Sequence, residues 1–288
     1  MPDLVQPVPA RYARHSRLTD PGDQAAFLGR FPAEPARLGA TIRTLTAHYR
    51  ATPGVPEARH AEADTRWMAD ILRRIREASA APLGEPRPLE ARFVGCCRDD
   101  ALLFVAALRQ HGQPARSRVG FAPYFTPGFF HDHVVGESWN GERWVRLDPE
   151  LDPAGYPFDT LDIPPEHFLS AAQVWRGVRA GTLDPAHFGV FPEAPDFLRG
   201  RDFIRRNLLL ELAALNGMEV LLWDGWGLTE TPAADLTPDD LALLDEVARA
   251  LVADDDAAIT RLYADPRLMV PPVVRSWPRG GGEVEVRL

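Results

Sequence analysis

The sequence contains no lysine, so all 32 of its Lys and Arg side chains are arginines. Such a chain offers no lysine amine for crosslinking to itself, although genome composition explains the bias more simply. Cysteine is almost as scarce, because the chain has only Cys96 and Cys97, which are adjacent. Adjacent cysteines lack the Cα separation and torsion of an ordinary disulfide. We therefore expect no structural disulfide and a reducing, cytoplasmic location.

Long apolar runs are also missing. The most apolar late stretch, residues 208–223, is interrupted by Glu211, Asn216 and Glu219. The N-terminal residues hold no apolar segment typical of a signal peptide, so neither a membrane span nor a secretion signal is expected. The net charge of −9, from 41 acidic and 32 basic side chains, argues against a nucleic-acid partner.

Metal-binding motifs are absent as well. The sequence has no EF-hand loop, no C-x-x-C and no H-E-x-x-H motif. His131 and His133 form an H-x-H pair that could bind a metal together with a cysteine, but two histidines on one face of a strand are common without one. We therefore expect no metal and no cofactor.

One stretch, from Cys96 to Asp148, supplies a thiol, an imidazole and a carboxylate in that order. Within it, residues 101–111 are strong helix formers, apolar on nearly all sides, and Gly112 follows as a helix stop. This pattern predicts a buried helix with Cys97 in its first turn. There the helix dipole and the N–H groups favour a thiolate and can hold a developing oxyanion. Cys97 is therefore the candidate nucleophile.

A hairpin signal follows the helix. Asn140-Gly141 lies between two alternating runs, which is typical of a type I′ turn with a two-residue loop. Such a loop would pair Trp139 with Glu142 and, further along the strands, His133 with Asp148. Directly opposed side chains have Cβ atoms about 4.5–5.5 Å apart. We therefore expect the hairpin to place an imidazole base beside an orienting carboxylate.

Helical patterns dominate the rest of the chain, and a small antiparallel sheet in the middle gives an α+β layout. The expected helices cover residues 24–29, 35–49, 62–80, 165–177, 202–215, 238–253 and 256–264; the expected strands outside the hairpin cover 115–121 and 283–288, with an aromatic loop over 122–130. We divide the chain into an N-terminal arm (1–20), a core with N-terminal helices (21–160) and a mostly helical C-terminal region packed on the core (161–288).

Four segments of this core form a further pattern. Gly-Cys-Cys-Arg-Asp at 95–99 is followed by Gly-Gln-Pro-Ala-Arg at 112–116, by His133 with Glu137, and by Gly-Glu-Arg-Trp-Val-Arg-Leu-Asp-Pro at 141–149. In order and spacing they resemble the core of the transglutaminase-like superfamily, which has a cysteine at a helix start, a G-I-P-A-R turn, an H-x-W-x-E strand and a G-x-W-x-x-x-D-P strand. The flanking regions resemble those of bacterial stand-alone members.

This resemblance implies a papain/transglutaminase-like α+β core, in which a central helix packs on a small antiparallel sheet, with additional helices at both ends. It also implies a triad in which Cys97 attacks a carbonyl, His133 takes the thiol proton and Asp148 orients the imidazole. Glu137 is expected to support the hairpin rather than to take part in chemistry.

Three positions depart from the family pattern. Cys96 adds a second cysteine, which we interpret as a small neighbour or a resolving thiol of Cys97. Val135 stands where the family usually has tryptophan, and Asp100 stands where an apolar or aromatic residue is common. These departures affect the expected substrate more than the expected triad.

Substrate contacts are expected close to the base. The candidates are Tyr124, Phe125, Phe129, His131 and Cys96. Packing in a satellite core explains the aromatic side chains at least as well.

The expected function is that of a cysteine-dependent enzyme that cleaves or transfers an amide or acyl group through a thioester intermediate. Water would make it a hydrolase, amidase or peptidase, and an amine would make it an acyltransferase. Its expected partner is an amide- or acyl-bearing small molecule, peptide or protein. The alternative is a non-catalytic binding or scaffold protein that retains the fold. The sequence leaves the substrate and the oligomeric state open.

Overall fold

The structure, a computed structural model, describes residues 10–288, so the first nine residues of the expected N-terminal arm lie outside the described residues. The chain divides into two compact units. The first unit comprises the described residues up to Ser117 together with Val135–Ile163, and the second comprises Arg118–Val134 together with Pro164–Leu288. Strands β3 (Ala115–Thr126) and β4 (Phe129–Trp139) contribute residues to both units.

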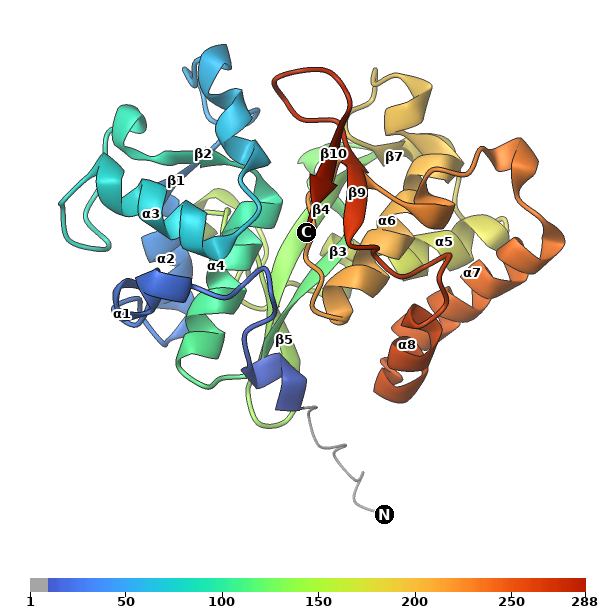
Figure 1. Cartoon of the computed structure of the whole chain (residues 1–288), viewed down its shortest axis with the longest axis horizontal. Helices are drawn as coiled ribbons and strands as arrows, with labels where there is room; N and C mark the ends of the chain where they lie inside the picture. The colour runs from blue at the N-terminus through green and yellow to red at the C-terminus, as the bar shows by residue number, and fades with distance from the viewer. Residues whose placement is uncertain (1–9) are drawn as a thin grey trace. The chain divides into compact units, whose positions relative to one another are not determined.

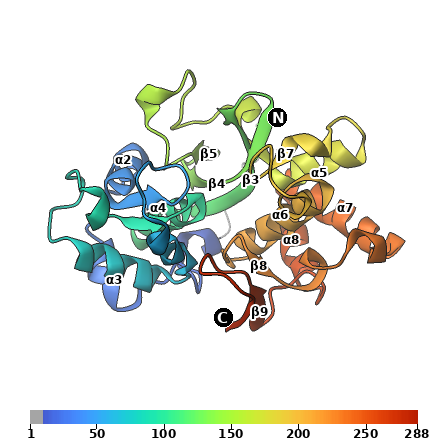
Figure 2. The same cartoon turned by 90° about the horizontal axis from the view of Figure 1, so that it is seen from above.

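The first unit is built around one buried helix. Its elements are α1 (Ala25–Leu28), α2 (Pro35–Leu45), β1 (Thr46–His48), α3 (Met68–Ala78), β2 (Phe93–Gly95), α4 (Cys97–Gln110) and β5 (Trp144–Leu147). Helices α1, α2 and α3 all contact α4, and Figure 2 shows α4 between α2 and α3. Thirteen residues in succession, from Cys97 to Arg109, are buried. The predicted all-round apolar helix is therefore confirmed, and it ends before Gly112, which has a φ of +73°.

Helix α4 packs on the antiparallel sheet β3-β4-β5 (Figure 1). The contact is close because Gly136 of β4 faces the ring of Phe104 on α4. A Cβ atom added at Gly136 would lie 2.3 Å from Phe104 Cδ1. Ala115 of β3 and Leu147 of β5 belong to the same apolar core. The predicted α+β core, with a central helix on a small antiparallel sheet, is confirmed.

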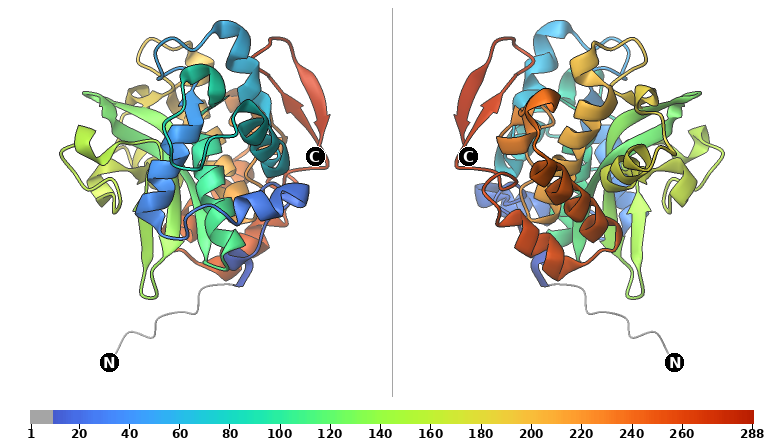
Figure 3. Two further views of the ribbon diagram at one scale, coloured as in Figure 1. Left: turned by 90° about the vertical axis from the view of Figure 1, so that its left-hand side faces the viewer. Right: turned by 90° about the vertical axis from the view of Figure 1, so that its right-hand side faces the viewer.

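Another part of the first unit differs from the sequence prediction. The helix expected over 35–49 ends at Leu45, and Thr46–His48 form the strand β1. This strand pairs in parallel with β2, Thr46 opposite Phe93 and His48 opposite Gly95. The pairing partner lies far along the sequence, so the local helical pattern gives no sign of it. Figure 3 (left) shows the helices of this unit after a turn of 90° about the vertical axis of Figure 1.

The hairpin of β4 and β5 exists, but the predicted register is wrong by two residues. Trp139 pairs with Trp144 instead of Glu142, and Gly136 pairs with Leu147. The loop has four residues because the Asn140 side chain accepts hydrogen bonds from the backbone N–H groups of Glu142 and Arg143, each at 2.9 Å. Continued by one pair, the register would put Val135 opposite Asp148. The predicted pairing of His133 directly opposite Asp148 is therefore wrong.

The second unit is mostly helical, and its largest helices are α5 (Ala171–Arg179), α6 (Gly200–Leu215), α7 (Pro238–Val252) and α8 (Asp256–Tyr263). Helix α5 packs against both α6 and α7, and Figure 3 (right) shows this unit facing the viewer. The predicted helices over 202–215, 238–253 and 256–264 are confirmed within one or two residues. Thr237 and Asp255 cap the last two through their side chains.

The second unit also contains five short strands, β6 to β10. Strand β6 (Leu169–Ser170) pairs with β3 at Phe121 and β7 (Phe188–Gly189) pairs in parallel with β4 at Phe130. Strands β8 (Asp224–Gly225), β9 (Val273–Ser276) and β10 (Val284–Arg287) form a separate sheet in the order β10-β9-β8.

Two expectations for the second unit are wrong. The expected helix over 165–177 begins at Ala171, because β6 pairing occupies Leu169 and Ser170. Residues 122–126, expected in a loop, continue β3 as a strand. Among residues 10–288, no helix combines the length and the apolar character needed to cross a bilayer.

Candidate functional site

Cys97 is the first residue of helix α4, as its sequence context predicts. The preceding residue, Cys96, caps the helix with an extended backbone. Its backbone N–H donates to Asp99 Oδ2 at 2.9 Å, and its thiol accepts from the backbone N–H of Asp99. This reciprocal arrangement is a capping box built with cysteine in the position that serine or threonine usually takes. The expected role of Cys96 in substrate binding is untested, and its contacts give it a structural role.

The residues around the cap explain the Gly-Cys-Cys-Arg-Asp motif. Asp99 is fully buried, and Arg98 Nη1 donates to its Oδ1 at 2.9 Å. Burial raises the pKa of Asp99, and the positive charge of Arg98 only partly opposes the shift. A Cβ atom on Gly95 would lie 2.8 Å from Asp99 Oδ2, so only glycine leaves room for this carboxylate. The motif therefore fixes the backbone on which Cys97 sits.

Asp148 follows directly after β5 and is buried. Its Oδ1 accepts a hydrogen bond from the backbone N–H of Glu150 at 3.0 Å, and its own backbone N–H donates to the carbonyl of Thr160 at 3.2 Å. These bonds to the turn after the strand fix the rotamer and the backbone of the candidate orienting carboxylate.

A further buried carboxyl group, Asp100, interacts electrostatically with Asp148 and Glu150. Its carboxyl group hydrogen bonds with Thr46, but among the described residues its Oδ1 atom has no hydrogen-bond partner. Burial raises the pKa of Asp100 well above its usual value, and the charge of Glu150 adds to the shift. Arg43 lies in the same electrostatic surroundings, where burial lowers its pKa and the nearby carboxylates oppose that change. This group was not predicted, and its one sign in the sequence is the unusual residue type at position 100.

Metal ligation within the first unit would fall to the two carboxylates after β5. One oxygen of Asp148 and one of Glu150 lie within 4.8 Å of each other. The expectation of no resident metal stays a prediction.

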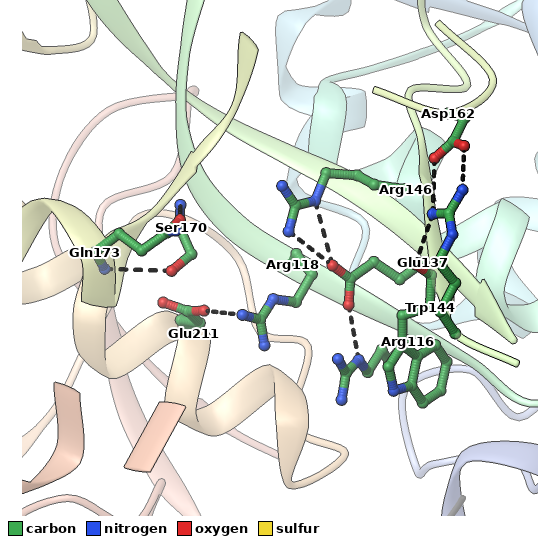
Figure 4. A network of polar contacts seen from close by, with 10 residues as sticks. Arg116, Arg118, Glu137, Trp144, Arg146, Asp162, Ser170, Gln173 and Glu211 are labelled. Carbon is green, nitrogen blue, oxygen red and sulfur yellow. Dashed lines mark hydrogen bonds and ion pairs between the residues drawn. The ribbon is translucent and has the colours of Figure 1, made fainter. Parts of the chain in front are cut away.

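Glu137 holds the hairpin to β3 through a buried ion-pair network (Figure 4). Its Oε2 accepts from Arg116 Nε at 2.8 Å, and its Oε1 accepts from Arg146 Nη2 at 2.9 Å. The Arg116 guanidinium also lies 4.0 Å from the centroid of the Trp144 ring. The interpretation of Glu137 as a support of the hairpin is confirmed.

The second unit has its own buried ion pair, also drawn in Figure 4, between Arg118 of β3 and Glu211 of α6 at 3.1 Å. The other oxygen of Glu211 accepts from the backbone N–H of Ala172 at 2.8 Å, in the first turn of α5. This carboxylate therefore links β3, α5 and α6. No sequence motif indicated it.

His133, the candidate base, lies on β4 in the second unit and is buried. Two aromatic side chains of β3 pack edge to face against its imidazole ring. The centroid of Phe125 lies 5.1 Å from that of the imidazole, and the centroid of Tyr124 lies 6.0 Å away. Two of the expected substrate-binding residues thus contact the candidate base.

His131 lies two residues earlier on β4. Its Nδ1 is 2.9 Å from the carbonyl oxygen of Val190, and its Nε2 is 2.9 Å from Thr126 Oγ1. Its ring also contacts Phe129, with centroids 5.1 Å apart, and Phe129 is buried. Both ring nitrogens of His131 are thus engaged by the protein. The proposed substrate contacts of His131 and Phe129 stay predictions.

The three candidate triad residues fall in different units. Cys97 and Asp148 belong to the first, and His133 belongs to the second. The triad therefore stays a prediction.

Residues 57–149 match the family model described as the transglutaminase-like superfamily, and this segment includes Cys97, His133 and Asp148. No curated protein matches the chain. A solved structure described as a "Putative Cysteine Protease" from Cytophaga hutchinsonii is similar with 16% sequence identity and a TM-score of 0.35, over 59% of this chain and 52% of that one. The chain thus spans about half the length of that structure. Residues 57–149 of this chain form a transglutaminase-like superfamily domain.

Proposed function

We propose that the protein is a cysteine-dependent enzyme that cleaves or transfers an amide or acyl group through a thioester intermediate. Cys97 is the nucleophile, His133 is the general base and then the general acid, and Asp148 orients the imidazole. The observation that carries the proposal is the position of Cys97 as the first residue of the buried helix α4, within a segment that matches the transglutaminase-like superfamily.

The reaction begins when Cys97 Sγ attacks the substrate carbonyl carbon and His133 accepts the thiol proton. N–H groups at the start of α4, including that of Cys97, stabilise the oxyanion of the tetrahedral intermediate. The intermediate collapses as the imidazolium gives its proton to the leaving amine, and the acyl group remains on sulfur as a thioester. Water or an amine then attacks the thioester, His133 accepts the attacking group's proton, and that proton returns to the departing thiolate.

The surroundings of Cys97 and Asp148 support their roles. The capping box of Cys96 and Asp99 holds the start of α4 in one conformation, so the N–H groups that face the oxyanion need no rearrangement. The hydrogen bond from Glu150 fixes one oxygen of Asp148. Orientation of a histidine by a fixed carboxylate is the third part of the general triad arrangement.

The test uses the variant Cys96→Ser, because serine retains the cap and leaves Cys97 as the only thiol. The rate of alkylation by iodoacetamide is measured from pH 5 to pH 9, and acetyl-Cys97 formed from p-nitrophenyl acetate is measured by mass spectrometry. We expect Cys97 in the folded protein to react faster than the same thiol in the unfolded protein, although it is buried. We expect His133→Ala to slow acetylation by about 100-fold to 10,000-fold.

Circular dichroism and the unfolding midpoint of each variant control for loss of the fold. A folded Cys96→Ser protein whose Cys97 reacts no faster than the unfolded thiol, and that forms no acetyl-enzyme, would contradict the proposal. That result would favour the non-catalytic alternative. Acetylation that is equally fast in folded His133→Ala would leave Cys97 as the nucleophile but remove His133 as the base.

A further inference from the structure

We propose that Phe125 and Tyr124 form the surface that binds an apolar or aromatic amine, either as the leaving group or as the acceptor that replaces water. This inference rests on the proposed role of His133 as the general base and acid. It assigns a chemical class to the amine that exchanges a proton with the imidazole.

The geometry next to the imidazole carries the argument. The Phe125 ring meets the His133 ring with centroids 5.1 Å apart and an interplanar angle of 73°. Tyr124 meets the same imidazole at 6.0 Å and 88°, and the two aromatic rings are 4.7 Å apart. The imidazole therefore has an aromatic wall made by two consecutive residues of β3.

One of the two residues of this aromatic wall is exposed to solvent. Phe125 is 38% exposed, whereas Phe121 of the same strand and Phe129 of β4 are buried. A buried core explains Phe121 and Phe129, but it does not explain an aromatic ring that is left partly in water beside a buried histidine. The exposed part of Phe125 is thus available to a substrate.

The wall is also held in place. The His131 ring lies 5.7 Å from the Phe125 ring at an interplanar angle of 84°. His131 is itself held at both ring nitrogens, by the Val190 carbonyl and by the Thr126 hydroxyl. A rigid aromatic surface loses little conformational entropy when a ligand binds.

The chemistry decides which part of the substrate meets this surface. A general base and acid must come within about 2.6–3.2 Å of the atom that gains or loses the proton. In acyl transfer that atom is the nitrogen or oxygen of the leaving group, and later that of the attacking group, whereas the acyl group stays on sulfur. The carbon atoms attached to such a nitrogen lie within one or two bond lengths of it, and so within reach of a ring 5.1 Å from the imidazole. Water gains nothing from this contact, but an apolar amine does.

The experiment follows the loss of the acetyl group from Cys97 after labelling with p-nitrophenyl acetate. The rate is measured by mass spectrometry in water alone, with methylamine and with 2-phenylethylamine. We expect 2-phenylethylamine to accelerate the loss more than methylamine and to yield N-acetyl-2-phenylethylamine. We expect Phe125→Ala to reduce the ratio of the two amine rates about tenfold, as for the loss of one strong aromatic contact.

The control variant is Phe197→Ala, which removes an even more exposed phenylalanine of the second unit, 73% exposed. It is expected to keep the wild-type ratio. Acetyl-Cys97 whose loss shows no preference for 2-phenylethylamine would overturn this inference and leave the proposed function standing. So would a preference that Phe125→Ala leaves unchanged. Failure to form acetyl-Cys97 at all would overturn the proposed function and this inference with it.

Discussion

Replacing Gly136 by alanine tests the contact that holds α4 on the sheet. The added Cβ atom would lie 2.3 Å from Cδ1 and 2.7 Å from Cε1 of Phe104, whose side chain is fully buried. Real Cβ atoms do not approach that closely, so the ring or the strand must move. Overpacking of this kind costs about 1–3 kcal/mol of unfolding free energy. For a domain of this general size the cost lowers the Tm by roughly 2–12 °C.

Replacing glycine by alanine also has a smaller, stabilising effect, which opposes the cost of the clash. Alanine restricts the unfolded chain more than glycine does, which stabilises a protein by about 0.4–1 kcal/mol where the folded backbone accepts it. The matched control is Gly155→Ala, because no heavy atom lies within 4 Å of a Cβ added there. We expect Gly155→Ala to be neutral or slightly stabilising and Gly136→Ala to be clearly destabilising, both measured by urea unfolding followed by circular dichroism.

A double-mutant cycle identifies the partner. In the background Phe104→Leu the ring atoms that would clash with the new Cβ are gone, so Gly136→Ala should cost less there than in the wild type. Coupling of 0.5–3 kcal/mol is typical for residues in direct contact. An equal cost in both backgrounds would refute the assignment of Phe104 as the residue that requires glycine at position 136.

Three further predictions concern the cap, the buried ion pairs and a buried carboxyl group. Cys96→Ala removes the cap of α4 and should cost about 1 kcal/mol, whereas Cys96→Ser should not, as measured by the urea midpoint. Glu137→Ala leaves two arginines without their counter-ion and should cost about 3–5 kcal/mol, whereas Asp162→Ala, at an exposed ion pair, should change little in the same unfolding measurement. Burial raises the pKa of Asp100 in the folded state, so wild-type stability falls relative to Asp100→Asn as the pH rises above the unfolded-state value of about 3.9. Unfolding at pH 3.5 and at pH 7 should therefore show Asp100→Asn gaining relative stability at pH 7, and a constant difference would contradict the prediction.

The sequence predicted the helices whose extent is marked by residues within them or next to them. Helix α4 has an apolar run within it and a glycine with positive φ after it, so the sequence predicts most of its extent. Helices α7 and α8, which begin after the capping residues Thr237 and Asp255, were also predicted within one or two residues. In contrast, β1 pairs with β2 more than forty residues away, and nothing local distinguishes its three residues from the end of a helix.

The register of the hairpin shows a limit of alternation patterns. A slip of one residue turns every side chain to the other face, but a slip of two residues preserves the faces, so both registers fit the same alternation. Cross-strand contacts therefore decide between the two registers. The observed register brings the Trp139 and Trp144 rings to 5.6 Å and puts Glu137 opposite Arg146, with which it forms an ion pair. These contacts outweigh the preference of Asn-Gly for a two-residue turn.

The candidate site was predicted in part. The position of Cys97 at a helix start followed from the sequence and is confirmed. The electrostatic surroundings of Asp148 were not predicted, because Asp100, Arg43 and Glu150 come from three separate segments and meet only in the folded first unit. The aromatic neighbours of His133 were named from their place in the sequence, yet the expected loop is a strand, and the strand sets their distances from the ring.

The fixed ring of His131 has a consequence for spectroscopy. A carbonyl oxygen can only accept a hydrogen bond, so the Nδ1 atom facing Val190 must carry the hydrogen, and the less common Nδ1–H tautomer follows when the ring is neutral. The ¹⁵N chemical shifts of this tautomer differ from those of the usual one. The ring nitrogens of His131 would therefore be recognisable in an NMR spectrum without mutagenesis. They would provide an internal reference for assigning the signals of His133, which lies two residues further along the chain.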